Sequence, residues 1–315
     1  TERFIRGTQR KIQQHKIHRL VWQSASVAAV FMIVLFSVLF TRENRPPESS
    51  VVNDVPVAGK TQAVLSLPDG RQVALGNEKE PDTAWMKYVE ACTIESKATT
   101  EPADIKIEVA RGGEYKIRLE DGTTVWLNSE SSLIYPEKFT GDKRAVRLSG
   151  EGYFEVARDE KKSFIVSVTD MEIKVLGTKF NVTAYQDEKM TTTTLISGAV
   201  EVVTPHRSVQ LQPGKQAMVQ EGGDDITVLE VDVELATSWT AGIFKFDKMA
   251  LTDICTRLSR WYDIDFVFEG ETGKEKFTGG TWKYVPLKDF LSKIERVTNV
   301  LFLFENNTVK VVPKK

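Results

Sequence analysis

Histidine, the commonest catalytic base and metal ligand, occurs only three times in this sequence. His15 and His18 lie in a basic stretch at the beginning, and His206 lies in the turn Thr204-Pro205-His206-Arg207. A Ser-His-Asp triad or a His-rich metal site needs histidine beside its partners in a folded domain. We therefore predict no catalytic residue, no metal site and no cofactor, and we do not expect an enzyme.

Carboxylates alone can cleave glycosidic bonds, so Asp69 and Asp121 need a separate explanation. Each precedes a glycine between two alternating runs, where Asp is favoured because its side chain supports a turn. Trp126, Trp239 and Trp282 suit either packing or a sugar-binding face. A membrane-tethered glycan-binding or glycan-cleaving protein stays as the alternative function, and it needs an open groove at Trp126 and Tyr153.

The two cysteines, Cys92 and Cys255, are too few for a disulfide framework or a four-ligand zinc site. Cys255 is spaced with Leu251, Ile254 and Leu258 as on one face of a helix. We predict a buried structural thiol at this position.

Positive charge is concentrated at the beginning of the chain. The net charge is −2, but residues 1–45 hold eight Lys or Arg against two Glu, which leaves residues 46–315 at −8. An acidic body without a basic patch argues against nucleic-acid binding. Residues 20–40 carry no charged side chain over 21 positions, enough to span a bilayer core of about 30 Å as a helix.

The order of these segments predicts a membrane topology. Because the basic cluster precedes residues 20–40, the positive-inside rule places residues 1–19 in the cytoplasm as a basic arm and the rest in the periplasm. The apolar stretch is too long for a signal peptide and lacks a small-x-small cleavage site, so we predict a single, uncleaved transmembrane helix in the inner membrane, in contact with lipid. Residues 41–60 mix Pro, Ser, Asn and Asp, as a linker does.

Residues 61–238 show short runs of period-2 alternation separated by turn dipeptides, which predicts an all-β domain of sandwich or solenoid type. Residues 65–76 resemble residues 116–128 at an offset of 52, so a hairpin is duplicated. Residues 77–104 are polar and are interpreted as an inserted loop with one short helix near 83–91. The predicted strands are 114–119, 123–127, 145–148, 153–157, 164–168, 172–176, 179–185, 199–203 and 216–220.

Residues 239–315 change to a repeated strand, helix, strand pattern. Residues 242–270 and 279–307 align at an offset of 36 without gaps. In each copy the helix has one apolar stripe and the next strand alternates, so we predict a duplicated β-α-β unit in which each helix packs on its own sheet. The fold class is therefore mainly β plus a small α/β domain.

Several sequence blocks resemble the FecR family of anti-sigma regulators, in particular its Bacteroidetes members, over residues 61–315. The duplicated C-terminal unit is similar to the secretin/TonB short N-terminal domain. The blocks are LEDGTTVWLNSESSLIYPEKF (119–139), LSGEGYFEVARD (148–159), VLGTKFNVTAY (175–185), LISGAVEV (195–202), LQPGKQAMV (211–219) and SWTAGIFKFDKMALTDICTRLSRWYDIDFVFE (238–269).

This resemblance implies a signal relay with two partners. The signalling domain of a TonB-dependent outer-membrane transporter contacts the periplasmic region, and an extracytoplasmic-function sigma factor responds in the cytoplasm. The family carries a folded sigma-binding domain before its membrane helix, whereas 19 residues precede residue 20 here. We expect the inner contact to be either a short helical segment or a domain missing from this sequence. The expected moving element is a hinge at residues 233–242.

Two sets of site residues follow. Some FecR-like regulators cut themselves at a Gly-Thr bond, and the resemblance implies the same self-cleavage between Gly177 and Thr178. The alternative is that Gly177 forms a turn or a β-bulge. For the transporter we select the C-terminal unit, because an incoming strand can extend an exposed sheet edge. The selected partner-binding residues are Phe244, Phe246, Phe266, Phe268 and Trp282.

Overall fold

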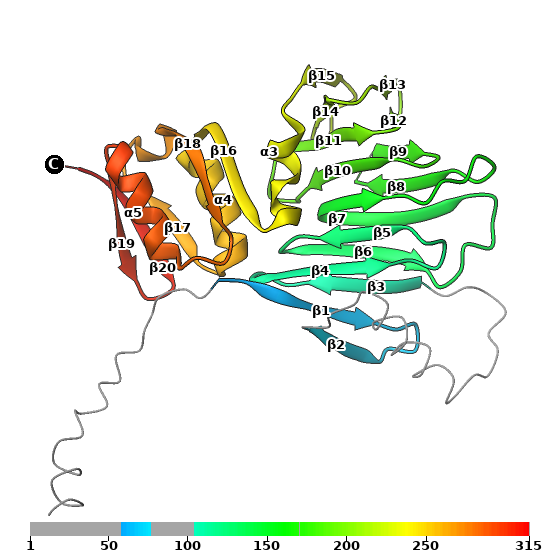
Figure 1. The fold of residues 1–315 in the computed structure, drawn as a ribbon, viewed down its shortest axis with the longest axis horizontal. Helices are drawn as coiled ribbons and strands as arrows, with labels where there is room; N and C mark the ends of the chain where they lie inside the picture. Colours follow the sequence, from blue (N-terminus) through cyan, green and yellow to red (C-terminus); the bar gives the residue numbers. More distant parts are fainter. Residues whose placement is uncertain (1–57, 77–103, 170, 315) are drawn as a thin grey trace, which may run out of the picture. The chain divides into compact units, whose positions relative to one another are not determined.

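The computed structural model describes residues 58–76, 104–169 and 171–314 (Figure 1). The predicted basic arm, transmembrane helix, most of the linker and the short helix near 83–91 lie outside these residues. Within the described ranges no helix is long and apolar enough to cross a membrane.

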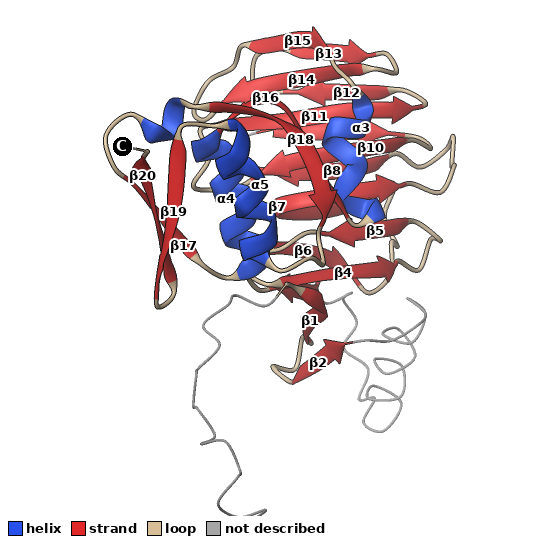
Figure 2. Cartoon of the chain, turned by 60° about the vertical axis from the view of Figure 1, so that its left-hand side comes forward, coloured by secondary structure: helices blue, strands red, loops and turns tan. Residues whose placement is uncertain are grey.

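Most of the described chain is β-structure, as predicted, and the helices are concentrated near the C-terminus (Figure 2). Residues 60–230, here called the β part, form a connected set of fifteen strands within the described ranges. These strands are β1 (Lys60–Ser66), β2 (Gln72–Gly76), β3 (Asp104–Val109), β4 (Gly113–Arg118), β5 (Thr124–Leu127), β6 (Ser131–Pro136), β7 (Arg144–Glu155), β8 (Phe164–Val168), β9 (Met171–Val175), β10 (Lys179–Ala184), β11 (Met190–Ser197), β12 (Val200–Val203), β13 (Ser208–Leu211), β14 (Lys215–Gln220) and β15 (Ile226–Glu230).

The long strand β7 joins two sheets. Its first half pairs with β6 and β8, and its second half pairs with β5 and β10. The change occurs at Gly150, whose φ of +92° suits glycine and where a Cβ would lie 2.4 Å from the Ser131 hydroxyl. The sequence pattern predicted two strands here, 145–148 and 153–157; that was wrong, because the glycine bends the strand without ending it.

Alternation along the strands produces one core between the two sheets. In β7 every second residue from Arg144 onward is buried, and the apolar ones join a cluster that runs from Ala63 to Val219. The strand predicted at 164–168 matches β8 residue for residue, and, apart from the two strands replaced by β7, the other predicted bounds lie within one residue of the observed ones. The mainly β class predicted for this region is confirmed, and all fifteen strands belong to one connected sheet.

The duplicated hairpin has the same geometry in both copies. In the first, Asp69 Oδ1 accepts a hydrogen bond of 2.9 Å from the Arg71 amide, and in the second Asp121 Oδ1 accepts one of 3.0 Å from the Thr123 amide. Each aspartate is followed by a glycine with φ of +85°. The turn interpretation of both aspartates is confirmed.

The C-terminal part, residues 243–313, contains both predicted strand-helix-strand copies plus one further strand. Its elements are β16 (Ile243–Ala250), α4 (Leu251–Tyr262), β17 (Asp265–Phe268), the 3-10 turn η2 (Thr272–Lys274), β18 (Lys276–Trp282), α5 (Leu287–Val297), β19 (Val300–Glu305) and β20 (Thr308–Pro313).

The two copies in the C-terminal part are interleaved. Strands β16 and β18 pair with each other, while β17 and β19 flank β20. Leu251 and Ile254 of α4 share one apolar cluster with Phe290 and Ile294 of α5. Each helix contacts the strands of its own copy, α4 with β16 and β17 and α5 with β18 and β19, as expected. The expectation of a separate sheet for each helix was wrong, because the strands pair across the copies and both helices bury their stripes in one core.

Candidate partner-binding surface and interdomain contact

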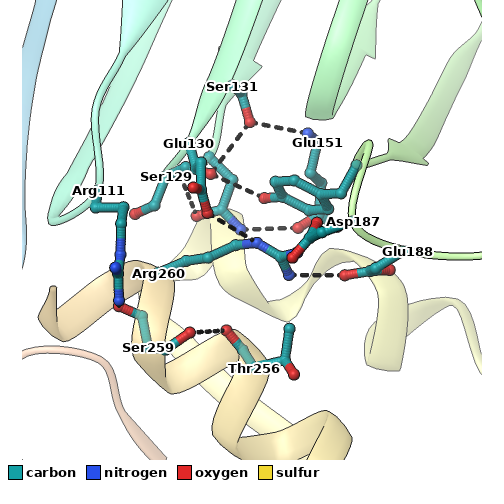
Figure 3. A network of polar contacts seen from close by, with 12 residues as sticks. Arg111, Ser129, Glu130, Ser131, Glu151, Asp187, Glu188, Thr256, Ser259 and Arg260 are labelled. Carbon is teal, nitrogen blue, oxygen red and sulfur yellow. Dashed lines mark hydrogen bonds and ion pairs between the residues drawn. The ribbon is translucent and has the colours of Figure 1, made fainter. Parts of the chain in front are cut away.

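The two parts meet through Arg260, which lies in the last turn of α4 and is buried in the contact (Figure 3). Its guanidinium donates to Glu188 at 2.7 Å, to Asp187 at 2.6 Å and to Glu130 at 3.2 Å. These three carboxylates belong to the β10–β11 and β5–β6 turns of the β part. One cation from the C-terminal part therefore holds two turns of the β part.

An aromatic ring completes the Arg260 site. The guanidinium carbon lies 3.7 Å from the ring centroid of Tyr185, whose hydroxyl donates to the Ser129 carbonyl at 2.9 Å. Burial raises the pKa of Tyr185 and also raises the pKa of Glu188, although the charge of Arg260 opposes the second shift. The Arg260 side chain is buried whereas its carboxylate partners reach solvent, so loss of these partners would leave a buried cation unpaired.

A second cation, Lys283, crosses the contact from the loop between β18 and α5. Its side chain is fully buried and donates to Glu114 of β4 at 2.7 Å. The ammonium lies 3.8 Å from the ring centroid of Trp261, with the ring of Trp239 farther away at 5.6 Å. Burial lowers the pKa of Lys283, against the opposing effect of Glu114. Aromatic faces and one carboxylate thus stabilise a buried charge.

The third contact is made by Arg111, in the turn between β3 and β4. Its guanidinium donates to the carbonyls of Ser259 at 3.0 Å and Ile264 at 2.8 Å, at the C-terminal end of α4. It also pairs with Asp263 and Asp265. A cation at a helix C-terminus is favoured by the helix dipole, so Arg111 fixes the end of α4 on the β part.

The segment that links the two parts is structured. It forms α3 (Val233–Thr237) and the 3-10 turn η1 (Ser238–Ala241). Trp239 is buried, and its indole N–H donates to the Asn181 side chain of β10 at 3.1 Å. The hinge expected at residues 233–242 stays a prediction, and the Trp239 contact opposes movement of this segment on the β part.

The structure separates the five selected partner-binding residues. The rings of Phe244 and Phe246 are buried in the core of the C-terminal part, and Phe266 and Phe268 are half-buried against it. Only Trp282, on β18, is well exposed, at 61%. Among the five, Trp282 alone presents a large apolar surface to a partner, so selecting Phe244 and Phe246 as contact residues was wrong.

The Gly177-Thr178 bond lies between β9 and β10. Thr178 is buried, and its hydroxyl donates to the Ala199 carbonyl at 2.9 Å. A Cβ on Gly177 would lie 2.8 Å from Arg158, so close packing accounts for this glycine. A carbonyl partner orients the hydroxyl but does not remove its proton.

Little of the chemistry needed for the glycan alternative is present. Lys116 places its ammonium 4.3 Å from the centroid of the Trp126 ring, and Tyr153 packs against the same ring at 5.3 Å. Asp121, one of the two aspartates considered as glycan-cleaving carboxylates, forms an ion pair with the buried Arg144 at 2.8 Å. In the described residues no group of His, Cys, Asp and Glu is arranged to hold a metal ion.

Cys255 is buried and free, as predicted.

Sequence reasoning did not find Arg260, Lys283 or Arg111. Each is a single charged residue whose partners lie far away in sequence; Lys283 and Glu114 are 169 positions apart. Of the tryptophans around Lys283, Trp239 was considered from the sequence, with packing as one of two interpretations, and Trp261 was not.

In the described residues, Arg260, Lys283 and Arg111 join the β part to the C-terminal part. The family described as "FecR protein" matches residues 105–201, and "FecR, C-terminal" matches residues 243–311. Two crystal structures of a Parabacteroides distasonis ATCC 8503 protein, provisionally named an anti-sigma factor, are 30% identical and cover 67% of this chain. The alignments span 99% and 100% of those chains, with TM-scores of 0.62 and 0.63. No curated protein matches the chain.

The chain therefore belongs to the FecR family of anti-sigma regulators. It is a regulator and signal transducer, not an enzyme, and a sigma factor belongs to its partners.

Proposed function

We propose that this chain is a single-pass inner-membrane regulator that relays a periplasmic signal to an extracytoplasmic-function sigma factor. Residues 1–19 lie in the cytoplasm, residues 20–40 cross the membrane and residues 41–60 link them to the periplasmic region. The periplasmic region consists of a β domain to residue 238 and a C-terminal domain from residue 239. The signalling domain of a TonB-dependent transporter is the periplasmic partner.

The observation that carries this proposal is the exposed Trp282 on β18. Among the described strands, β16 and β18 pair only with each other, so β18 keeps one edge free for an incoming strand. An exposed tryptophan beside such an edge is typical of the residues that dominate binding energy. The adjacent residue Lys283 reaches the β part, so a partner at Trp282 binds next to the interdomain contact.

The test is crosslinking of the full-length chain in native membranes, followed by identification of the captured proteins. We expect both a TonB-dependent transporter and a sigma factor. A variant lacking residues 240–315 should lose the transporter and retain the sigma factor. Capture of the transporter by this shortened variant with unchanged affinity would show that the interface lies on the β part.

Topology is tested separately with a reporter that is active only in the cytoplasm. Fused before Thr1 it should be active, and fused after Lys315 it should be silent. The reverse result would exclude the proposed orientation, and with it the relay.

A further inference from the structure

The residues that lead into β1 lie on the interdomain contact. Gly59 is buried, and a Cβ added to it would lie 2.6 to 2.7 Å from three atoms of the Trp261 ring. Ala58 packs against the apolar cluster of the C-terminal part. Because no side chain fits between the backbone at residue 59 and the indole, the chain here rests directly on α4.

Main-chain hydrogen bonds continue this contact. The Lys60 amide donates to the Gly112 carbonyl at 2.9 Å, and the Gly112 amide donates to the Arg260 carbonyl at 2.7 Å. Residues 58–60, here called the entry segment, are therefore bound both to the β3–β4 turn and, through it, to the end of α4. Separation of the two parts breaks this arrangement.

Trp261 connects the entry segment to the second interdomain cation. Its indole N–H donates to the Lys283 carbonyl at 2.7 Å, and its ring lies 3.8 Å from the Lys283 ammonium. The same residue thus contacts Gly59 and Lys283, and it is almost fully buried. A shift of this ring affects both neighbours, since packed interiors leave no space to absorb it.

We propose that seating of the entry segment on Trp261 and closure of the interdomain contact are one coupled equilibrium, through which the C-terminal part controls the segment that precedes β1. This inference rests on the proposed function, because it gives the relay its route from the periplasmic partner toward residues 20–40. A partner that binds the open arrangement more tightly releases the entry segment. By linkage, pulling the entry segment off Trp261 weakens the interdomain contact by the same free energy.

Hydrogen exchange on the full-length chain in a mild detergent tests the coupling from both sides. Arg260→Met should raise exchange at the Lys60 amide by at least about tenfold, although residue 60 is not changed. Gly59→Val should raise exchange around residues 283–285 by a similar factor. Arg296→Met is the control for the first variant because Arg296 is exposed on α5. Gly76→Val is the control for the second, since the nearest atom to a Cβ there is 3.7 Å away.

Protection of β8 amides in each variant shows that the β part remains folded. Gly59→Ala, with a smaller clash, should give an intermediate increase. If Gly59→Val leaves residues 283–285 fully protected, or if Arg260→Met leaves Lys60 unchanged, the coupling is wrong. Crosslinked capture of the transporter and sigma factor is read independently of exchange, so the coupling can fail while the proposed function stands.

Discussion

The Lys283 ammonium lies 2.7 Å from the Glu114 carboxylate, and this pair joins the C-terminal part to the β part through fully buried space. A charge in such a place is tolerated only when partners replace water. Here one carboxylate and the face of Trp261 do so. The pair therefore fixes how the two parts dock, whatever its net contribution to stability.

Lys283→Met should lower the free energy of unfolding by about 3 kcal/mol, because Glu114 loses its buried cation. The Tyr284 hydroxyl, 2.7 Å away, remains as a partner of Glu114 but carries no positive charge. Urea unfolding followed by tryptophan fluorescence measures the loss. The double variant Lys283→Met/Glu114→Gln should recover more than half of it, since no unpaired charge remains.

Lys276→Met is the matched control for this measurement. Lys276 lies at the start of β18, the strand that leads into the Lys283 loop, but is exposed, so its loss should change stability by no more than about 0.5 kcal/mol. Equal losses for Lys276→Met and Lys283→Met would contradict a specific role of the buried pair.

The pH dependence of stability should reveal the partly buried carboxyl of Glu188. Burial raises its pKa above the ordinary value of 4.5, so the folded state binds this proton more tightly than the unfolded state does. Its contribution to stability is therefore complete below about pH 4.5 and is lost as the pH rises through the folded-state pKa. Relative to the non-titrating variant Glu188→Gln, the wild type should become less stable between about pH 4 and pH 7.

Asp159 provides a control of opposite sign. Hydrogen bonds from the Lys161 and Lys162 amides lower its pKa, so its contribution is present above the unfolded-state value and is lost as the pH falls. The wild type should therefore gain stability over Asp159→Asn as the pH rises. Thermal unfolding at a series of pH values measures the stability of the wild type relative to each variant. If this stability difference changed with pH in the same direction for Glu188→Gln and Asp159→Asn, the burial effect at Glu188 would be ruled out.

Trp282→Ala should weaken binding of the transporter signalling domain by at least about tenfold, with little effect on folding. The side chain is exposed at 61%, and residue 282 pairs with Ile243 of β16 through the backbone, so its removal leaves no cavity in the core. Val297→Ala is the control, because Val297 is also exposed, at 70%, and lies on α5 of the same part. Calorimetric titration measures the affinity of both variants for the signalling domain. Unchanged affinity for Trp282→Ala would show that the binding site does not include Trp282.

Strands and their faces were predictable where local periodicity decides them. In β16 the alternation Phe244, Lys245, Phe246 places both phenylalanines on one face, and the structure buries that face. The same rule, applied consistently, excludes these two rings as partner contacts and favours Trp282, whose neighbour in the strand, Thr281, is the buried one. The error arose because the aromatic residues were selected by type, without asking which face of the strand each one occupies.

The interdomain contact was not predictable from periodicity. Arg260 lies off the apolar stripe of α4, where a charged side chain is normally solvated. It is buried only because the β5–β6 and β10–β11 turns, 130 and 72 positions away, close over it. Such long-range packing depends on how two folded parts dock, and a single sequence carries no local pattern for that.

The family resemblance implies self-cleavage at Gly177-Thr178, whereas the alternative is a purely structural role, and mass analysis of the purified full-length chain distinguishes the two. The reaction requires the Thr178 oxygen to attack the Gly177 carbonyl carbon, the peptide C–N bond to break and water to cleave the resulting ester. The hydroxyl proton must pass to a base, whereas here it is donated to the Ala199 carbonyl. We therefore expect one intact chain after prolonged incubation, and two fragments meeting at 177/178 that vanish in Thr178→Ala would contradict this.

If Thr178 is structural, its hydroxyl should have a measurable effect on folding. Thr178→Ala loses one buried hydrogen bond and leaves the Ala199 carbonyl without this donor, which should cost about 1 kcal/mol. Thr193 is the matched comparison, because its buried hydroxyl has no hydrogen-bond partner. Thr193→Val should therefore be neutral or stabilising, since it replaces an unsatisfied polar atom with a methyl group of similar size. Urea unfolding measures the free energy of unfolding of both variants. A lower value for Thr178→Ala, without a lower value for Thr193→Val, assigns Thr178 a structural role between β9 and β10.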